Sequence, residues 1–362
     1  MRSFKPKGWI RVAREFQVDA LGARLRVALD GFAEADADRL RDQWRRLAAE
    51  GDAADTITVA AAPGPGADVS GHDLDAVGIA LRRALNQRAI EANRGELVTF
   101  HAAGLADPAT GEVIALVGPS GAGKSTAAAM LGAGLGYVSD ETVAVTPSGE
   151  VLAFPQPLAF KETAAHGRHV AGPDELGLLR PGPRLRLARI ALLDRTDAAT
   201  APTISTVGLR DVFDEIVAQV NHFNALPRPL SLLDALVRRC GGVQVISYRE
   251  AADLVEPVRE LLRSGADSGP TYSRADVDDW VDLDGDTVVL ARDTITRLTA
   301  LSSLVWRVLE VPLTLTRLVA VAEREFGPAP GGSSADALRA VLHELADAGL
   351  VRSSGARHRA RD

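Results

Sequence analysis

The sequence predicts an α/β fold made of two α/β regions, followed by a smaller α+β module toward the C-terminal end. Three observations support this prediction. Short apolar runs alternate with helical patterns as far as residue 263. One such run, residues 113–117, leads directly into a glycine-rich turn and then a helical pattern. After a linker rich in Ser, Gly and Asp, the pattern changes to a hairpin followed by three segments in which apolar residues recur at helical spacing.

Residues 1–72 are predicted to form the first α/β region. Its elements are strands at 9–16, 23–30 and 56–60 and a helix at 34–51. Leu40, Trp44 and Leu47 recur at helical spacing on one face, and Gly51 is expected to end the helix.

Residues 73–263 are predicted to form the second α/β region, beginning with a helix that carries Leu74, Val77, Leu81 and Leu85 on one face. Further elements are strands at 96–106, 113–117, 136–146, 151–154, 186–194 and 243–248, and helices from 124, at 208–223, at 230–240 and at 249–264. Residues 155–183 are rich in Pro and Gly and are expected to form a long loop.

Residues 264–275 are predicted to be a linker, and residues 276–352 a separate module. Asp284-Gly285 is a typical hairpin turn between two apolar strand patterns, and residues 294–298 supply a third strand. Three helical patterns follow. The polar tail, residues 353–362, is expected to be disordered.

Composition narrows the class of protein. The net charge of −7 and the lack of a dense basic stripe argue against nucleic-acid binding. No run of about 18 apolar residues is present, so no membrane span is expected. The single cysteine, Cys240, excludes an internal disulfide and is typical of a reducing compartment, and we expect a cytoplasmic protein.

The strongest motif lies at Gly118–Ser125, which fits G-x-x-x-x-G-K-[ST] between a strand pattern and a helix pattern. Such a loop points backbone N–H groups at phosphate oxygens, while the following helix adds its positive end. The alternative is an ordinary glycine turn. The residues expected to bind ATP or another nucleoside triphosphate are Gly118, Ser120, Gly121, Gly123, Lys124, Ser125 and Thr126.

Phosphoryl transfer also needs a carboxylate near the metal ion and a group that orients the nucleophile. Asp140 and Glu141 follow a strand pattern 22 and 23 residues after Gly118. With Ser125 they are the candidate Mg²⁺ ligands. A solvated acidic pair at a strand end is the alternative. His101 lies on the preceding strand pattern, where a packed or surface histidine is also a common finding.

The run FHAAGLADPATGEVIALVGPSGAGKST, with YVSDETVAV after it, resembles the HPr kinase/phosphorylase catalytic domain, which phosphorylates serine hydroxyls on proteins or peptides. The resemblance covers about residues 74–262 and implies an unusual P-loop fold. It assigns His101 to the family's histidine and Asp140 and Glu141 to its acidic pair, one of which acts as base. The family usually has Asp-Asp, so Glu141 departs from the pattern and Asp140 is the better candidate base.

In that family a loop beyond the acidic pair helps to close over the substrate. Lys161, and also Arg168, could stabilise the transferring phosphoryl group from the corresponding segment, although a solvated loop is an equally good interpretation. His166 and His169 have no third metal ligand nearby in the sequence. Transporter ATPases share the glycine loop, but the chain has no LSGGQ-type segment. Guanylate kinases also have this loop but carry it near the N-terminus, whereas it follows more than 100 residues here, so this class is disfavoured.

Residues 276–352 resemble PqqD-like domains, which are also called RiPP recognition elements. The resemblance implies a three-stranded sheet packed on three helices that binds leader peptides by adding a strand to the sheet edge. A plain winged-helix module is the alternative. A DNA-reading winged helix is disfavoured, because residues 333–349 carry three acidic residues and one Arg.

Together the resemblances imply an ATP- and Mg²⁺-dependent kinase that phosphorylates a Ser or Thr hydroxyl of a ribosomally made precursor peptide, held through residues 276–352. Two alternatives stay open. One is a nucleotide-binding recognition subunit that presents the precursor to other tailoring enzymes without catalysing transfer. The other is a kinase acting on a folded protein. The sequence leaves homo-oligomerisation open.

Overall fold

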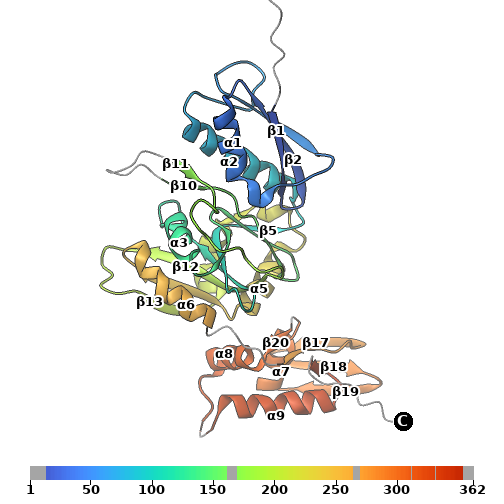
Figure 1. Ribbon diagram of the computed structural model, residues 1–362. Helices are drawn as coiled ribbons and strands as arrows, with labels where there is room; N and C mark the ends of the chain where they lie inside the picture. Colours follow the sequence, from blue (N-terminus) through green and yellow to red (C-terminus); the bar gives the residue numbers. More distant parts are fainter. Residues whose placement is uncertain (1–13, 161–168, 264–269, 311, 331, 354–362) are drawn as a thin grey trace, which may run out of the picture.

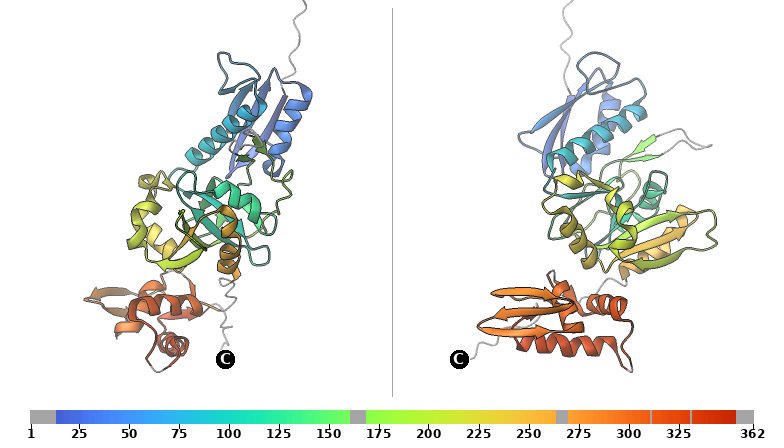
Figure 2. Two further views of the ribbon diagram at one scale, coloured as in Figure 1. Left: turned by 90° about the vertical axis from the view of Figure 1, so that its left-hand side faces the viewer. Right: turned by 180° about the vertical axis from the view of Figure 1, so that it is seen from behind.

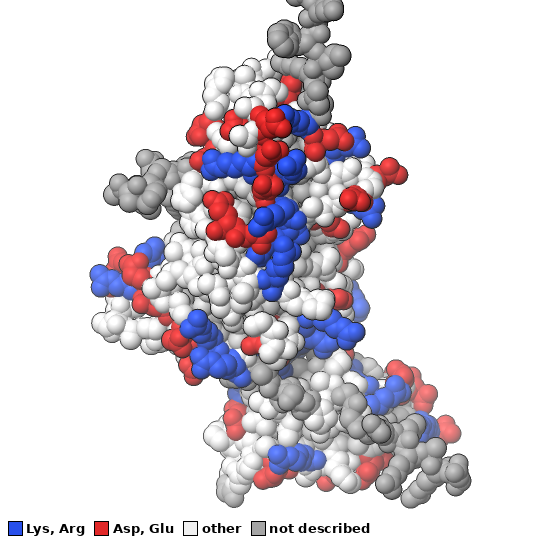
Figure 3. Space-filling model, viewed as in Figure 1, with Lys and Arg blue, Asp and Glu red and all other residues white. Residues whose placement is uncertain are grey.

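The structure is a computed structural model that describes residues 14–160, 169–263, 270–310, 312–330 and 332–353. The N-terminal unit, the central unit and the C-terminal module follow one another along the chain and along the molecule (Figure 1). Every helix in these described segments is too short or too polar to cross a lipid bilayer. Acidic and basic side chains are interspersed on the face shown in Figure 3.

The N-terminal unit is a four-stranded sheet with two helices on one face. Its elements are β1 (Arg14–Ala20), β2 (Ala23–Asp30), α1 (Glu34–Gln43), the 3₁₀ turn η1 (Arg45–Leu47), β3 (Asp55–Ala60), β4 (Val69–Ser70) and α2 (Leu74–Ala92). β1 is antiparallel to β2, and β2, β3 and β4 run parallel. The predicted helix at 34–51 therefore ends earlier, and Leu40 and Trp44 pack in this core as expected.

The helix α2 joins the N-terminal core, although the predicted boundary at residues 72 and 73 falls just before it. Val77, Leu81, Leu85 and Ala89 are buried against the N-terminal strands. Their spacing places them on one helical face, and burying that face removes four apolar side chains from water. Asp73 begins the helix by accepting a hydrogen bond from Asp75 N at 3.1 Å.

The central unit is built on a nine-stranded sheet. Its main order is β13-β15-β12-β6-β5-β8-β9, with β7 and β14 also pairing with β5. These strands are β5 (Val98–Ala106), β6 (Glu112–Val117), β7 (Gly136–Ser139), β8 (Thr142–Val145), β9 (Val151–Leu152), β12 (Arg186–Arg195), β13 (Thr203–Val207), β14 (Val220–Asn221) and β15 (Val243–Tyr248). β6, β12 and β15 are parallel, whereas β5 is antiparallel to β6.

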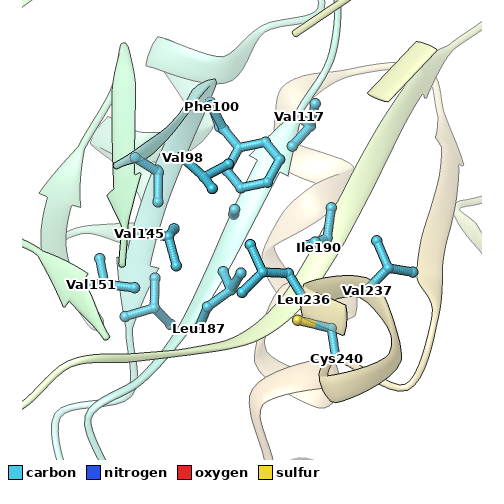
Figure 4. Packing of buried hydrophobic residues seen from close by; sticks show 14 of the residues in the cluster. Val98, Phe100, Val117, Val145, Val151, Leu187, Ile190, Leu236, Val237 and Cys240 are labelled. Carbon is cyan, nitrogen blue, oxygen red and sulfur yellow. The ribbon is translucent and has the colours of Figure 1, made fainter. Parts of the chain in front are cut away.

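Helices cover both faces of this sheet, so its central strands are apolar on both sides. Along β6, Val113, Ala115 and Val117 pack in a core that lies against α5 (Pro229–Arg239). Cys240, directly after this helix, belongs to the same core (Figure 4). Ile114 and Leu116 face the opposite core, with α3 (Lys124–Leu131) and α6 (Val255–Arg263). The 3₁₀ turns η3 (Phe223–Ala225) and η4 (Ala251–Leu254) precede α5 and α6.

Two segments of this unit differ from expectation. The helix predicted at 208–223 is reduced to η2 (Leu209–Val212) and α4 (Phe213–Val217), because β14 leaves the helical path to pair with β5. Buried backbone N–H and C=O groups of β5 need hydrogen-bond partners, and the segment around β14 supplies them. His101 N, for example, donates to Gln219 O at 2.7 Å. The predicted loop at 155–183 contains the hairpin β10 (Leu158–Phe160) and β11 (His169–Ala171).

The C-terminal module has two small sheets and three helices around one core. The strands β17 (Asp279–Leu283), β18 (Asp286–Ala291) and β19 (Thr294–Leu298) form an antiparallel sheet (Figure 2). The helices are α7 (Ala300–Val308), α8 (Leu315–Phe326) and α9 (Ser334–Asp347), and the second sheet has the order β20 (Leu313–Thr314), β16 (Thr271–Arg274), β21 (Val351–Ser353). The second half of the predicted linker is thus a strand, held between two strands of this module.

Candidate functional site

The glycine-rich loop connects β6 to α3 at the carboxyl ends of the parallel strands. Gly121 and Gly123 have φ values of +94° and +87°, a region that side-chain-bearing residues rarely adopt. At Gly118 a Cβ would lie 3.1 Å from Leu193 Cβ, so the small residue also permits close packing against β12. Ser120 and Thr126 are exposed and Ser125 is half-buried, which leaves this end of α3 open to a ligand.

Lys124 is buried within the loop that precedes it. Its Nζ donates to Gly118 O at 2.5 Å and to Pro119 O at 3.1 Å. These carbonyl contacts hold the ammonium group beside the start of α3, where the backbone N–H groups of the helix are also directed. The loop therefore concentrates positive charge at one point, which is the arrangement a phosphate chain needs.

His101 lies on β5 beside this loop. Ala102 pairs with Val117, so His101 is one position along from the point at which β6 enters the loop. Burial and the charge of Lys124 lower the pKa of His101 below its ordinary value of 6.5, against the opposing effect of Glu141. This shift favours the neutral imidazole, which is the form that can accept a proton.

The acidic pair lies in the turn between β7 and β8. Glu141 Oε1 is 3.6 Å from His101 Nε2, and the Glu141 side chain is 36% exposed. Asp140 has a fully buried side chain. Although the sequence favours Asp140 as the base, Glu141 is thus the carboxylate that solvent and a substrate can reach.

Asp140 is surrounded by residues that the sequence did not single out. Its Oδ1 accepts from Arg82 Nη2 at 2.8 Å and from Tyr137 Oη at 3.1 Å. Tyr137 Oη also contacts Gln156 O at 2.9 Å. Burial and the charge of Asp140 raise the pKa of Tyr137 well above its ordinary value. The phenol therefore stays protonated and acts as a hydrogen-bond donor. The one signal available in the sequence is a tyrosine in the strand pattern that precedes the acidic pair.

Arg82 comes from α2 and contacts both carboxylates through one nitrogen atom. Its Nη2 lies 2.8 Å from Asp140 Oδ1 and 2.9 Å from Glu141 Oε2. Burial opposes the charged form, but the two carboxylates outweigh it and raise the pKa of Arg82. One turn along α2, Asn86 Oδ1 accepts from Thr142 Oγ1 at 2.8 Å, so this helix is attached to the turn twice.

The donor atoms present suit Mg²⁺ in combination with phosphate oxygens. Asp140 Oδ2 is buried and accepts no hydrogen bond from the described residues, which is a feature of a carboxylate oxygen suited to a cation. Ser125 and Glu141 offer further oxygen atoms of the kind that Mg²⁺ prefers. Within the described segments no group of three or more His, Cys, Asp or Glu gathers as a metal site. Mg²⁺ generally combines one or two carboxylates with waters and substrate phosphate oxygens.

Lys161 lies outside the described residues, so its place in the site stays a prediction; Arg168 and His166 lie outside them as well. His169 stacks on Phe160 with ring centroids 4.9 Å apart, in the hairpin that follows the acidic pair. The structure thus brings His101 and Glu141 together beside the loop that holds Lys124, and keeps Asp140 beneath them.

Comparison with known proteins adds little to this geometry. No protein-family model and no curated protein matches the chain. The solved structures that are similar include the HPr(Ser) kinase/phosphatase from Coxiella burnetii, at 15% identity and a TM-score of 0.24, over 46% of this chain and 94% of that one. A TM-score this low does not establish a shared fold or activity. The protein has a mixed α/β core in which a glycine-rich loop joins a strand to a helix.

Proposed function

We propose that this protein is an ATP-dependent kinase that phosphorylates a Ser or Thr hydroxyl of a ribosomally synthesised precursor peptide. The observation that carries the proposal is the position of His101 and the accessible Glu141 carboxylate beside the glycine-rich loop that holds Lys124. This set contains a base, a cationic phosphate clamp and a helix N-terminus, which are the parts that phosphoryl transfer requires.

In the proposed reaction the Glu141–His101 pair takes the proton of the peptide hydroxyl. The hydroxyl oxygen forms a bond to the γ-phosphorus of ATP as the bond to the bridging oxygen breaks, and ADP leaves with that electron pair. Lys124 and the loop N–H groups bind the phosphate oxygens. Ser125 and the acidic pair would hold Mg²⁺, which would neutralise phosphate charge. Asp140 is not the base in this scheme, because its side chain is fully buried.

The C-terminal module is proposed to hold the leader part of the peptide. β17 and β19 are the outer strands of their sheet, and Trp280, Val281, Leu283 and Ile295 are exposed on them. Outer strands offer unpaired backbone groups to an extended peptide, and exposed apolar side chains offer contact area. Tethering the leader would raise the local concentration of the hydroxyl at the loop.

A second candidate function is a recognition subunit that binds nucleotide but transfers no phosphate. The burial of Asp140 beneath Arg82 and Tyr137 favours it, because a carboxylate so enclosed cannot reach a substrate. In that case the module would present precursors to other tailoring enzymes. A kinase that acts on a folded protein is a third candidate, and it would not need the outer strands of the module.

Mass spectrometry of precursor peptides after incubation with ATP and Mg²⁺ separates these candidates. We expect the parent protein to add one phosphate per peptide, Glu141→Gln to lower turnover by about 100-fold, and Lys124→Ala to abolish nucleotide binding. Glu344→Gln, an exposed carboxylate on α9, is the matched control. Nucleotide binding without any phosphopeptide would support the recognition subunit, and a Glu141→Gln variant with full turnover would remove Glu141 from the reaction.

A further inference from the structure

Arg82 belongs to one structural unit and acts on another. The helix α2 is anchored in the N-terminal core by Leu81 and Leu85, which lie beside Arg82 in sequence and are both fully buried. Arg82 itself reaches the turn that carries the acidic pair of the central unit. Any movement of α2 relative to the central sheet therefore changes the charge next to Asp140 and Glu141.

This ion pair is incompletely satisfied. Arg82 Nε and Asp140 Oδ2 are buried, and neither has a hydrogen-bond partner within the described part of the chain. Buried polar atoms without partners cost free energy, so a contact that satisfied them would compete well with the present one. A divalent cation beside a nucleotide would provide such a contact for the carboxylate oxygen.

We propose that Arg82 is a displaceable counter-ion that competes with the divalent cation for the Asp140–Glu141 pair. In the absence of metal, the guanidinium neutralises charge that the turn would otherwise bury unpaired. When Mg²⁺ arrives with the nucleotide, the carboxylates exchange one cation for the other and Arg82 is released. The N-terminal unit then responds to metal–nucleotide binding through α2.

The proposal rests on the proposed nucleotide site and on no step of phosphate transfer. Its test is therefore a binding measurement. The dissociation constant of a non-hydrolysable ATP analogue is measured by calorimetry in Mg²⁺ and again in EDTA. The ratio of the two constants is the gain in affinity that the metal brings. A side chain that only supports the fold would change both constants together and leave this ratio unaltered.

We expect Arg82→Gln to increase the Mg²⁺-dependent gain by about tenfold, because the competing cation is removed. Arg82→Lys keeps the charge and should stay near the parent value. Arg83→Gln is the matched control, since Arg83 is the exposed neighbour on the same helix, and it should equal the parent. A ratio in Arg82→Gln that is unchanged or smaller overturns the proposal.

A second measurement uses the unaltered protein, in case Arg82→Gln does not fold. Hydrogen exchange along α2 should become faster with Mg²⁺ and the analogue than with the analogue in EDTA, because the contact at Arg82 is lost. Unchanged or slower exchange contradicts the release of Arg82.

If the parent binds no analogue, the proposed function fails together with this inference. If the analogue binds and the ratio does not respond to Arg82→Gln, this inference alone fails.

Discussion

At the scale of single residues, the site depends on which ionisable groups are buried and which are exposed. Asp140 and Glu141 are neighbours in sequence, yet the first is enclosed by Arg82 and Tyr137, and the second faces His101 and solvent. Both carboxylates contact Arg82, but the Asp140 side chain is fully buried whereas that of Glu141 is 36% exposed. The chemical role of each therefore follows from its burial and not from its place in the motif.

The lowered pKa of His101 predicts a pH dependence of stability. Below about pH 6.5 the unfolded chain takes up a proton that the folded protein resists, so the free energy of unfolding falls as pH decreases from 6.5 toward the lowered pKa. Urea unfolding at about pH 7.5 and about pH 5.5 should show a smaller acid-induced loss for His101→Gln than for the parent. His343→Gln, at an exposed position on α9, is the control. An undiminished loss in His101→Gln would contradict this assignment.

At the scale of secondary-structure elements, β5 organises the site because several strands pair with it. β6 enters the glycine-rich loop, and β7 and β8 flank the acidic turn. Gly104 allows this crowding: a Cβ there would lie 2.8 Å from Val143 Cγ2 and 3.1 Å from Val138 Cβ. The register between β5 and β7 also shifts directly after Gly104, so the pairing of these two strands is locally irregular.

We expect Gly104→Ala to destabilise the protein by about 1–3 kcal/mol, because two β-branched side chains and their strands would have to move apart. Urea unfolding, read as a lower midpoint at an unchanged slope, measures the effect. The control is Gly182→Ala, where no atom lies within 4 Å of the added Cβ. Equal stability of the two variants would show that β7 and β8 do not approach β5 this closely.

At the scale of the whole molecule, the C-terminal module docks on the end of the central unit opposite the N-terminal unit (Figures 1 and 2). Two arginines of α8 contact the central unit. Arg324 Nη2 donates to Gly241 O at 2.6 Å. Arg317 donates to Arg239 O and, at 3.1 Å, to Ala188 O. Cations at the carboxyl end of α5 satisfy carbonyl groups that the helix leaves unpaired. The module has a hydrophobic core of its own.

We therefore expect residues 270–353, which include β16, to fold alone and to bind leader peptide in fluorescence anisotropy. Ile295→Asp should weaken this binding by about tenfold without unfolding the fragment, since Ile295 is 73% exposed. Val289 would be a poor choice for this test because its side chain is fully buried in the module's core. A folded fragment that binds no precursor would leave a kinase acting on a folded protein as the better account.

The sequence alone determined the elements whose signals are local. The glycine spacing, the strand before it and the helix after it predicted the loop at Gly118–Ser125, and the Asp284-Gly285 turn predicted the β17–β18 hairpin. Both depend on backbone conformations that few residue types adopt, so the residue types reveal them. Only the tertiary structure decided which groups surround Asp140. Arg82 is 58 residues away in sequence and reaches Asp140 because the apolar face of α2 packs on the N-terminal sheet, a long-range contact that no local pattern encodes.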